Sequence, residues 1–277
     1  MNETYYYGQG KVYLARRIND GSSLNWRWVG DVSSLTVSLV VDRKFRKQSC
    51  GGQLAISQYH IIEQSGSVSA IWHEHSPENL AVILLGNIIS AESGRETEQL
   101  TNVVAGGRYS VRHPNIRRMT IEGLKDGVDY VVDKVFGAID FLTTPRIPVV
   151  TVFYTYAGNT NTALYTRKPE QLALRYEGIN LAENGVPVLL ELYKLEFEPI
   201  SAMALINTST SLAGLETNAA LMLDSSRSAD DALGRFGRVA NIAQIEAEVS
   251  TQTDMIYNTG SISGEFITAY PKPRNRE

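Results

Sequence analysis

The sequence has little cysteine, no long apolar run and no excess of positive charge. Its one cysteine, Cys50, cannot form an internal disulfide, and a single thiol makes a cysteine-based zinc site implausible. No run of about 18 apolar residues is present, so no segment has the length of a transmembrane helix. The first residues, Met1–Tyr7, lack the basic and apolar regions of a signal peptide. We therefore expect a soluble protein made in a reducing compartment, with no membrane insertion by this chain.

The charge balance argues against a protein that grips nucleic acid. The 26 Lys and Arg are outnumbered by 30 Asp and Glu, which gives a net charge of −4. A domain that binds phosphates usually carries a basic excess. The 277 residues, 43% of them apolar and 20% charged, have the composition of a globular protein with one large or two modest domains.

Most of the chain reads as short extended segments between turns. Leu35, Val37, Leu39 and Val41 alternate with mostly polar residues, which is typical of a half-buried antiparallel strand. The turn residues Glu183–Gly185 favour a hairpin, and the segment after them reads as a strand, although its composition would also allow a helix. Further predicted strands are Lys11–Ala15, Ile56–Ile62, Val68–His75, Val149–Tyr156, Leu172–Tyr176 and Val188–Phe197.

One short helix is predicted after His75. Ser76 can cap it, Pro77 suits its first position, Leu80–Leu85 supplies apolar helix formers and Gly86 ends it. No repeat or linker divides the chain. We therefore predict a mainly β fold, an antiparallel β-sandwich or barrel-like core with a flanking short α-helix, over residues 1–240, followed by an unassigned C-terminal extension, 241–277.

A search for catalytic patterns yields no convincing site. His73 and His75 are the best metal ligands, because residues two apart on a strand point to one side, but no spacing places a third ligand near them. Cys50 lies among cations without a positioned base. No Gly-rich phosphate loop and no Gly-x-Ser-x-Gly pattern occurs. We expect no enzyme, no catalytic residue, no bound metal and no cofactor.

A basic segment after the first long strand is the strongest candidate for a binding role. Its members are predicted to lie in a polar loop that ends at Gln53, and they could contact phosphates and a base, or dock on a neighbouring protein. The acidic balance of the rest of the chain favours protein docking. The predicted subunit-interface residues are Arg43, Lys44, Phe45, Arg46, Lys47 and Gln48.

The order of several segments resembles that of bacteriophage tail tube proteins. Each segment is a pattern of apolar, glycine and turn residues, and together they span most of the chain. The segments that carry the resemblance are Gly8–Ala15, Val29–Val32, Ser76–Gly86, Leu174–Asn180, Pro187–Tyr193 and Leu233–Gly237.

This resemblance implies a structural virion protein. In that family six copies form a ring around a channel, rings stack into a hollow tube, and DNA leaves the capsid through it. The loop at Arg43–Gln53 would reach neighbouring subunits. The implied partners are further copies, the tape measure and tube-end proteins and DNA in transit, and the implied location is the virion tail, assembled in the host bacterial cytoplasm.

Two alternatives remain open from the sequence. One is a related low-copy component, a tube-end or hub protein that caps stacking. The other is a metal-dependent enzyme that uses His73 and His75.

Overall fold

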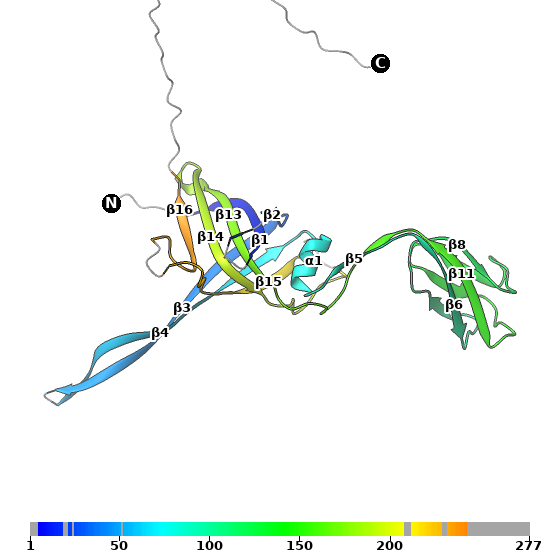
Figure 1. The fold of residues 1–277 in the computed structure, drawn as a ribbon, viewed down its shortest axis with the longest axis horizontal. Coiled ribbons are helices and arrows are strands. Elements are labelled where there is room, and N and C mark those ends of the chain that lie inside the picture. Colours follow the sequence, from blue (N-terminus) through cyan, green and yellow to red (C-terminus); the bar gives the residue numbers. More distant parts are fainter. Residues whose placement is uncertain are drawn as a thin grey trace, which may run out of the picture. The chain divides into compact units, whose positions relative to one another are not determined.

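A computed structural model describes residues 5–18, 22–23, 25–50, 52–207, 212–228 and 232–242 (Figure 1), all within the first of two units, Met1–Ala243. Its strands are β1 (Gly8–Arg16), β2 (Arg27–Trp28), β3 (Val32–Cys50), β4 (Gln53–Trp72), β5 (Ile88–Ala91), β6 (Gly94–Thr101), β7 (Arg108–Ser110), β8 (Ile116–Ile121), β9 (Tyr130–Asp133), β10 (Ala138–Phe141), β11 (Val149–Tyr156), β12 (Asn159–Thr162), β13 (Gln171–Asn180), β14 (Val186–Phe197), β15 (Leu215–Leu221) and β16 (Gly237–Asn241). The helices are α1 (Pro77–Ile83) and the 3₁₀ turn η1 (Leu181–Glu183). The predicted mainly β class with antiparallel sheets and a short helix is confirmed.

The main sheet has the order β2-β1-β13-β14-β15-β4-β3, with β16 paired to β14. All its pairs are antiparallel. The segment 188–197 is a strand, as predicted, and not a helix. The predicted turn before it is also confirmed, because Asn184 and Gly185 both have positive φ, 53° and 77°.

Helix α1 begins and ends close to the predicted residues. The Ser76 side chain accepts a hydrogen bond from the Asn79 backbone N–H at 3.3 Å, and Pro77 lies in the first turn. Ala81 and Ile83 are both buried, and Ile83 belongs to the hydrophobic cluster of the main sheet. The helix stops at Ile83, two residues before the end of the predicted apolar run, and the Gly86 N–H closes it on the Ala81 carbonyl.

The chain bends at Gly30, between β2, which pairs with β1, and β3, which pairs with β4. Residues 27–28 pair with β1, and the Val29 N–H donates to the Val12 carbonyl at 3.0 Å. Gly30 then has φ +89°, and a Cβ there would overlap the side chain of Glu74, so glycine is required. From Val32 onward the path pairs with β4 instead. Because of this bend, β3 does not hydrogen-bond to β1, although it directly follows β2 in the sequence.

The described residues contain two hydrophobic clusters with no residue in common. The first lies in the main sheet and α1 and includes Trp72, Leu174 and Leu195. The second is formed by β6–β11, in the three-stranded sheets β6-β11-β8 and β7-β10-β9, and includes Phe141 and Val150. The chain enters and leaves this second region through the two-stranded ribbon β5–β12. The predicted domain, residues 1–240, contains both clusters.

Two boundaries predicted around β4 are wrong. Residues 56–62 and 68–75 are not separate strands, because one continuous strand runs to Trp72. Gly66 does not form a turn: it pairs with Leu39 and Leu221 of the two flanking strands, and a Cβ there would crowd both side chains. A glycine within a strand pattern here marks a close approach of neighbours. His73 and His75 lie after the strand, in the connection to α1.

Candidate assembly surface

The prediction of a loop from Arg43 to Gln53 is wrong, because most of this segment is β-strand. The structure places Arg43, Lys44, Phe45, Arg46, Lys47 and Gln48 in β3, and the β3–β4 ladder continues to the pair Cys50↔Gln53. Beyond Leu39 and Gly66 these two strands pair only with each other among the described strands. The segment is thus the outer part of a long β-hairpin, and charged residues on a free strand edge are compatible with a strand.

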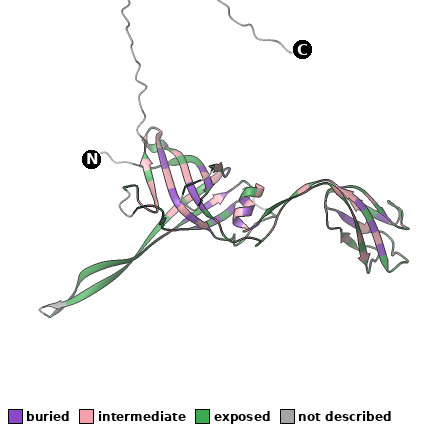
Figure 2. Ribbon diagram, viewed as in Figure 1, coloured by how far each residue is buried: buried purple, intermediate pink, exposed green. Residues whose placement is uncertain are grey.

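The hairpin has one apolar face, which we call the stripe. Directly opposed residues share a face of an antiparallel pair. The stripe consists of the rungs Leu39↔Gly66, Val41↔Gln64, Arg43↔Ile61, Phe45↔Tyr59 and Lys47↔Ile56. Its large side chains are exposed: Leu39 is 72%, Phe45 52% and Tyr59 61% accessible (Figure 2). Lys47 Nζ lies 5.4 Å from the centre of the Phe45 ring, within the range of a cation–π contact.

The opposite face of the hairpin is mostly polar, with the exposed Val40, opposite Ser65, as an apolar exception. Its rungs include Asp42↔Glu63, Lys44↔His60 and Arg46↔Gln58. Two bulges, between Asp42 and Arg43 and between Arg46 and Lys47, keep this division by adding the extra residues on β4. The exposure of apolar side chains is therefore confined mainly to one side of the ribbon.

The stripe continues the core-facing side of the main sheet. Leu35 and Val37 occupy the same alternation on β3 and pack against the first cluster, as do their partners Ala70 and Val68. The next residues in that alternation, Leu39 and Val41, do not belong to the first cluster and are 72% and 39% exposed. A core-type face thus extends past the core that the subunit itself provides, which is typical of an interaction surface.

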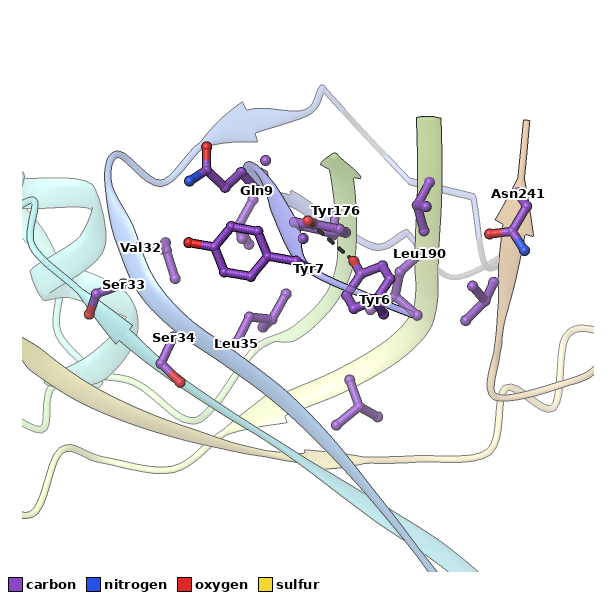
Figure 3. A pocket seen from close by; sticks show the side chains of 16 residues that line it. Tyr6, Tyr7, Gln9, Val32, Ser33, Ser34, Leu35, Tyr176, Leu190 and Asn241 are labelled. Atoms are coloured by element: carbon purple, nitrogen blue, oxygen red, sulfur yellow. Dashed lines mark hydrogen bonds between the residues drawn. The ribbon is translucent and has the colours of Figure 1, made fainter. Parts of the chain in front are cut away.

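A cleft of about 820 Å³ lies where the main sheet opens (Figure 3). Cross-strand rows lead into it from the core. The buried row Leu14↔Leu174↔Leu192 is followed by the row Val12↔Tyr176↔Leu190↔Val239. In that second row Val12 is buried, whereas Val239 is 69% exposed. Val32, Leu35 and Val37 line the other side from β3. None of the described residues that line the cleft is charged.

Tyrosines cover the glycine backbone at the mouth of the cleft. The Tyr176 ring lies over Gly10 and Gly178, where a Cβ would overlap it, and the Tyr6 ring lies over Gly8. The two hydroxyls are 3.5 Å apart (Figure 3). Burial, followed by the hydrogen bond between its hydroxyl and that of Tyr6, raises the pKa of Tyr176 well above its usual value. Tyr176 therefore stays neutral at physiological pH.

Asn180 holds the tyrosine segment on the sheet. Its side chain accepts from the Tyr7 N–H at 2.9 Å and donates to the Tyr5 carbonyl at 2.8 Å. The Leu181 N–H donates to the Tyr7 carbonyl at 2.8 Å. Tyr6 and Tyr7 stay exposed to solvent while their backbone is fixed. Sequence reasoning missed this segment, because the run of tyrosines carries no pattern that relates it to β13.

Among the residues that the structure describes, no third ligand lies beside His73 and His75. His73 Nδ1 faces the Ala213 carbonyl at 3.4 Å, and His75 Nδ1 faces the His73 carbonyl at 3.3 Å. The described residues contain no group of three or more His, Cys, Asp or Glu side chains that could hold a metal ion. His113 stacks on Tyr156, with ring centres 4.0 Å apart, far along the sequence in the second cluster region. No helix of the described chain is long and apolar enough to cross a membrane.

Comparison with known proteins assigns a family but no activity. The family described as Protein of unknown function UCP028589 matches residues 5–240, so the chain belongs to it. No curated protein matches the chain.

Proposed function

We propose that this member of the UCP028589 family is a structural subunit of a bacteriophage tail tube. Six copies would form a ring, rings would stack, and DNA would pass through the channel. The proposal is supported by the order of sequence segments shared with tail tube proteins and by the assembly surface. Its central observation is the stripe, a core-type apolar face that the described part of the subunit leaves uncovered.

Self-association gives this surface a physical role. Burial of Leu39, Phe45 and Tyr59 in a contact between copies would stabilise that contact by roughly 25 cal/mol for each Å² of apolar area removed from water. An exposed strand edge as long as that of β3 is an aggregation hazard unless a partner covers it. Repeated contact between copies turns the hazard into ordered assembly.

The net charge suits a DNA conduit. With 30 acidic against 26 basic residues the subunit repels phosphates on balance. Weak attraction would allow DNA to slide without forming the ion pairs that slow its release.

Assembly of the purified full chain tests the proposal. We expect rings or tubes in negative-stain micrographs and a molar mass of several subunits in light scattering. The double variant Phe45→Ser/Tyr59→Ser should remove them, whereas Lys44→Ser/His60→Ser, on the adjacent rung and the opposite face, should retain them. A monodisperse wild-type monomer at high concentration under all conditions would overturn the proposal. A tail particle with only a few copies would instead favour a tube-end or hub protein.

A further inference from the structure

We propose that the cleft of one copy receives the stripe of the next copy, in a head-to-tail contact. This inference rests on the proposed function, because it names the surface that the hairpin contacts. The occupant is a second copy of this chain. Its stripe residues are Leu39, Val41, Phe45, Tyr59 and Ile61, and the receiving wall is the row Val12, Tyr176, Leu190 and Val239.

The two surfaces match in chemistry. Both present branched aliphatic and aromatic side chains. The stripe side chains and Val239 are exposed, whereas Tyr176 and Leu190 are half-buried and Val12 is buried. The glycines of the wall, Gly10 and Gly178, leave only the flat Tyr176 ring above the backbone, so large side chains such as Phe45 and Tyr59 can approach closely. Packing of this kind forms the buried centre of stable interfaces.

The cations of the stripe fit the rim of the cleft. Arg43 and Lys47 interrupt the stripe, and the described lining of the cleft contains no cation to repel them. Tyr6 and Tyr7 offer exposed rings and hydroxyls at its mouth (Figure 3). Arginine and lysine form favourable cation–π contacts over tyrosine rings. The charged residues can therefore stay at the wet rim while the apolar ones are buried.

A copy cannot fill its own cleft with its own stripe. Leu35 and Val37 already form one side of the cleft, and Leu39 and Val41 follow them on the same face of the same strand. Folding the hairpin back would break the β3–β4 ladder. The contact is therefore between different surfaces of two copies, and such contacts produce rings or filaments rather than closed pairs.

Mixing two defective full-length variants tests the pairing. Val239→Arg blocks the cleft at an exposed position and keeps the stripe, and Phe45→Ser/Tyr59→Ser removes the stripe and keeps the cleft. Each variant alone should stay monomeric in sedimentation velocity. An equimolar mixture should form a species of twice the monomer mass that does not grow, because one good contact remains. Circular dichroism would first establish that each variant has the wild-type strand content.

The matched control is Val135→Arg, a valine of the same 69% exposure in the second cluster region. It should assemble as the wild type does. Tubes formed by Val239→Arg, or a mixture without the double-mass species, would overturn the head-to-tail contact while leaving the tube proposal intact. A wild-type chain that never assembles would overturn both.

Discussion

Asn79 connects three segments through one buried amide. Its side chain donates to the carbonyls of Val29 at 2.7 Å and Glu74 at 2.8 Å and accepts from Arg27 Nη1 at 2.6 Å. We expect Asn79→Leu to lower the free energy of unfolding by at least about 1–3 kcal/mol, because buried carbonyls lose their donors. Urea unfolding would measure it. Asn87→Ala, at an exposed asparagine, should change stability by less than about 0.5 kcal/mol, and equal effects would contradict the role of Asn79.

Arg17 and Asp224 form a buried ion pair. Their side chains are 6% and 3% exposed, and the charged atoms are 2.8 Å apart. We expect Arg17→Met to lower the unfolding free energy by about 3–5 kcal/mol, because the buried carboxylate then keeps only the more distant Arg227, at 3.7 Å, as a described cationic partner. Arg16→Met, next in sequence but exposed and paired with Glu170, should cost about 0–1 kcal/mol. Similar losses for both variants in denaturant titrations would show that the pair has no special role.

The same ion pair predicts that the stability of the fold depends on pH in the acidic range. Burial alone would raise the pKa of Asp224, but hydrogen bonds from Ser226 and the charge of Arg17 outweigh it and lower the pKa. The carboxylate therefore stabilises the fold above its ordinary pKa of about 3.9, and this contribution is lost as pH falls below that value. The stability difference between wild type and Asp224→Asn should shrink from pH 6 to pH 3. A constant difference would contradict this prediction.

At the scale of elements, the second cluster region should be separable from the main sheet. The two clusters share no residue, and Ala91 pairs with Asn159 across the β5–β12 ribbon. We expect a chain in which an Asn-Gly turn replaces residues 92–158 to fold, because the main core keeps all its members. Its near-ultraviolet circular dichroism and cooperative unfolding would measure this. A molten chain that binds a hydrophobic dye would contradict it.

Alternation and turn chemistry predicted most of the main-sheet strands. The alternation of residues 35–41 and the turn before residues 188–197 are local sequence features that predict a strand. The outer hairpin was missed because Arg43–Lys47 lacks apolar alternation, and only its partners on β4 make it a strand. Of the residues predicted as an interface, Arg43, Phe45 and Lys47 lie on the stripe and Lys44, Arg46 and Gln48 on the opposite face, and their interface role stays a prediction. Tyr59 and Ile61, which complete the stripe, were assigned only to a strand.

The cleft could not be predicted, for a similar reason. Its second row joins Val12, Tyr176, Leu190 and Val239, which lie on four strands far apart in sequence. Each of these residues has an ordinary local pattern. Their common face follows from long-range register, which a single sequence does not fix.

At the scale of the whole molecule, each hydrophobic cluster contains a tyrosine that resists ionisation. Burial first, and then hydrogen bonding, raises the pKa of Tyr176 beside the main core and of Tyr154 in the second cluster. Above about pH 10 the unfolded chain releases these protons and the folded chain keeps them, so stability should fall as pH rises. Urea midpoints between pH 8 and pH 11 would measure the loss. Tyr154→Phe/Tyr176→Phe should flatten the profile, and an unchanged slope would contradict the assignment.

The β5–β12 ribbon has a practical consequence. Opposed residues of an antiparallel pair lie about 4.5–5.5 Å apart. A foreign domain whose two termini are close together could therefore be inserted between Ala91 and Asn159. Cargo spliced there would leave the residues of the main core unchanged. In a tube built as proposed, every subunit would carry one cargo, and the particle would become a regularly spaced display scaffold.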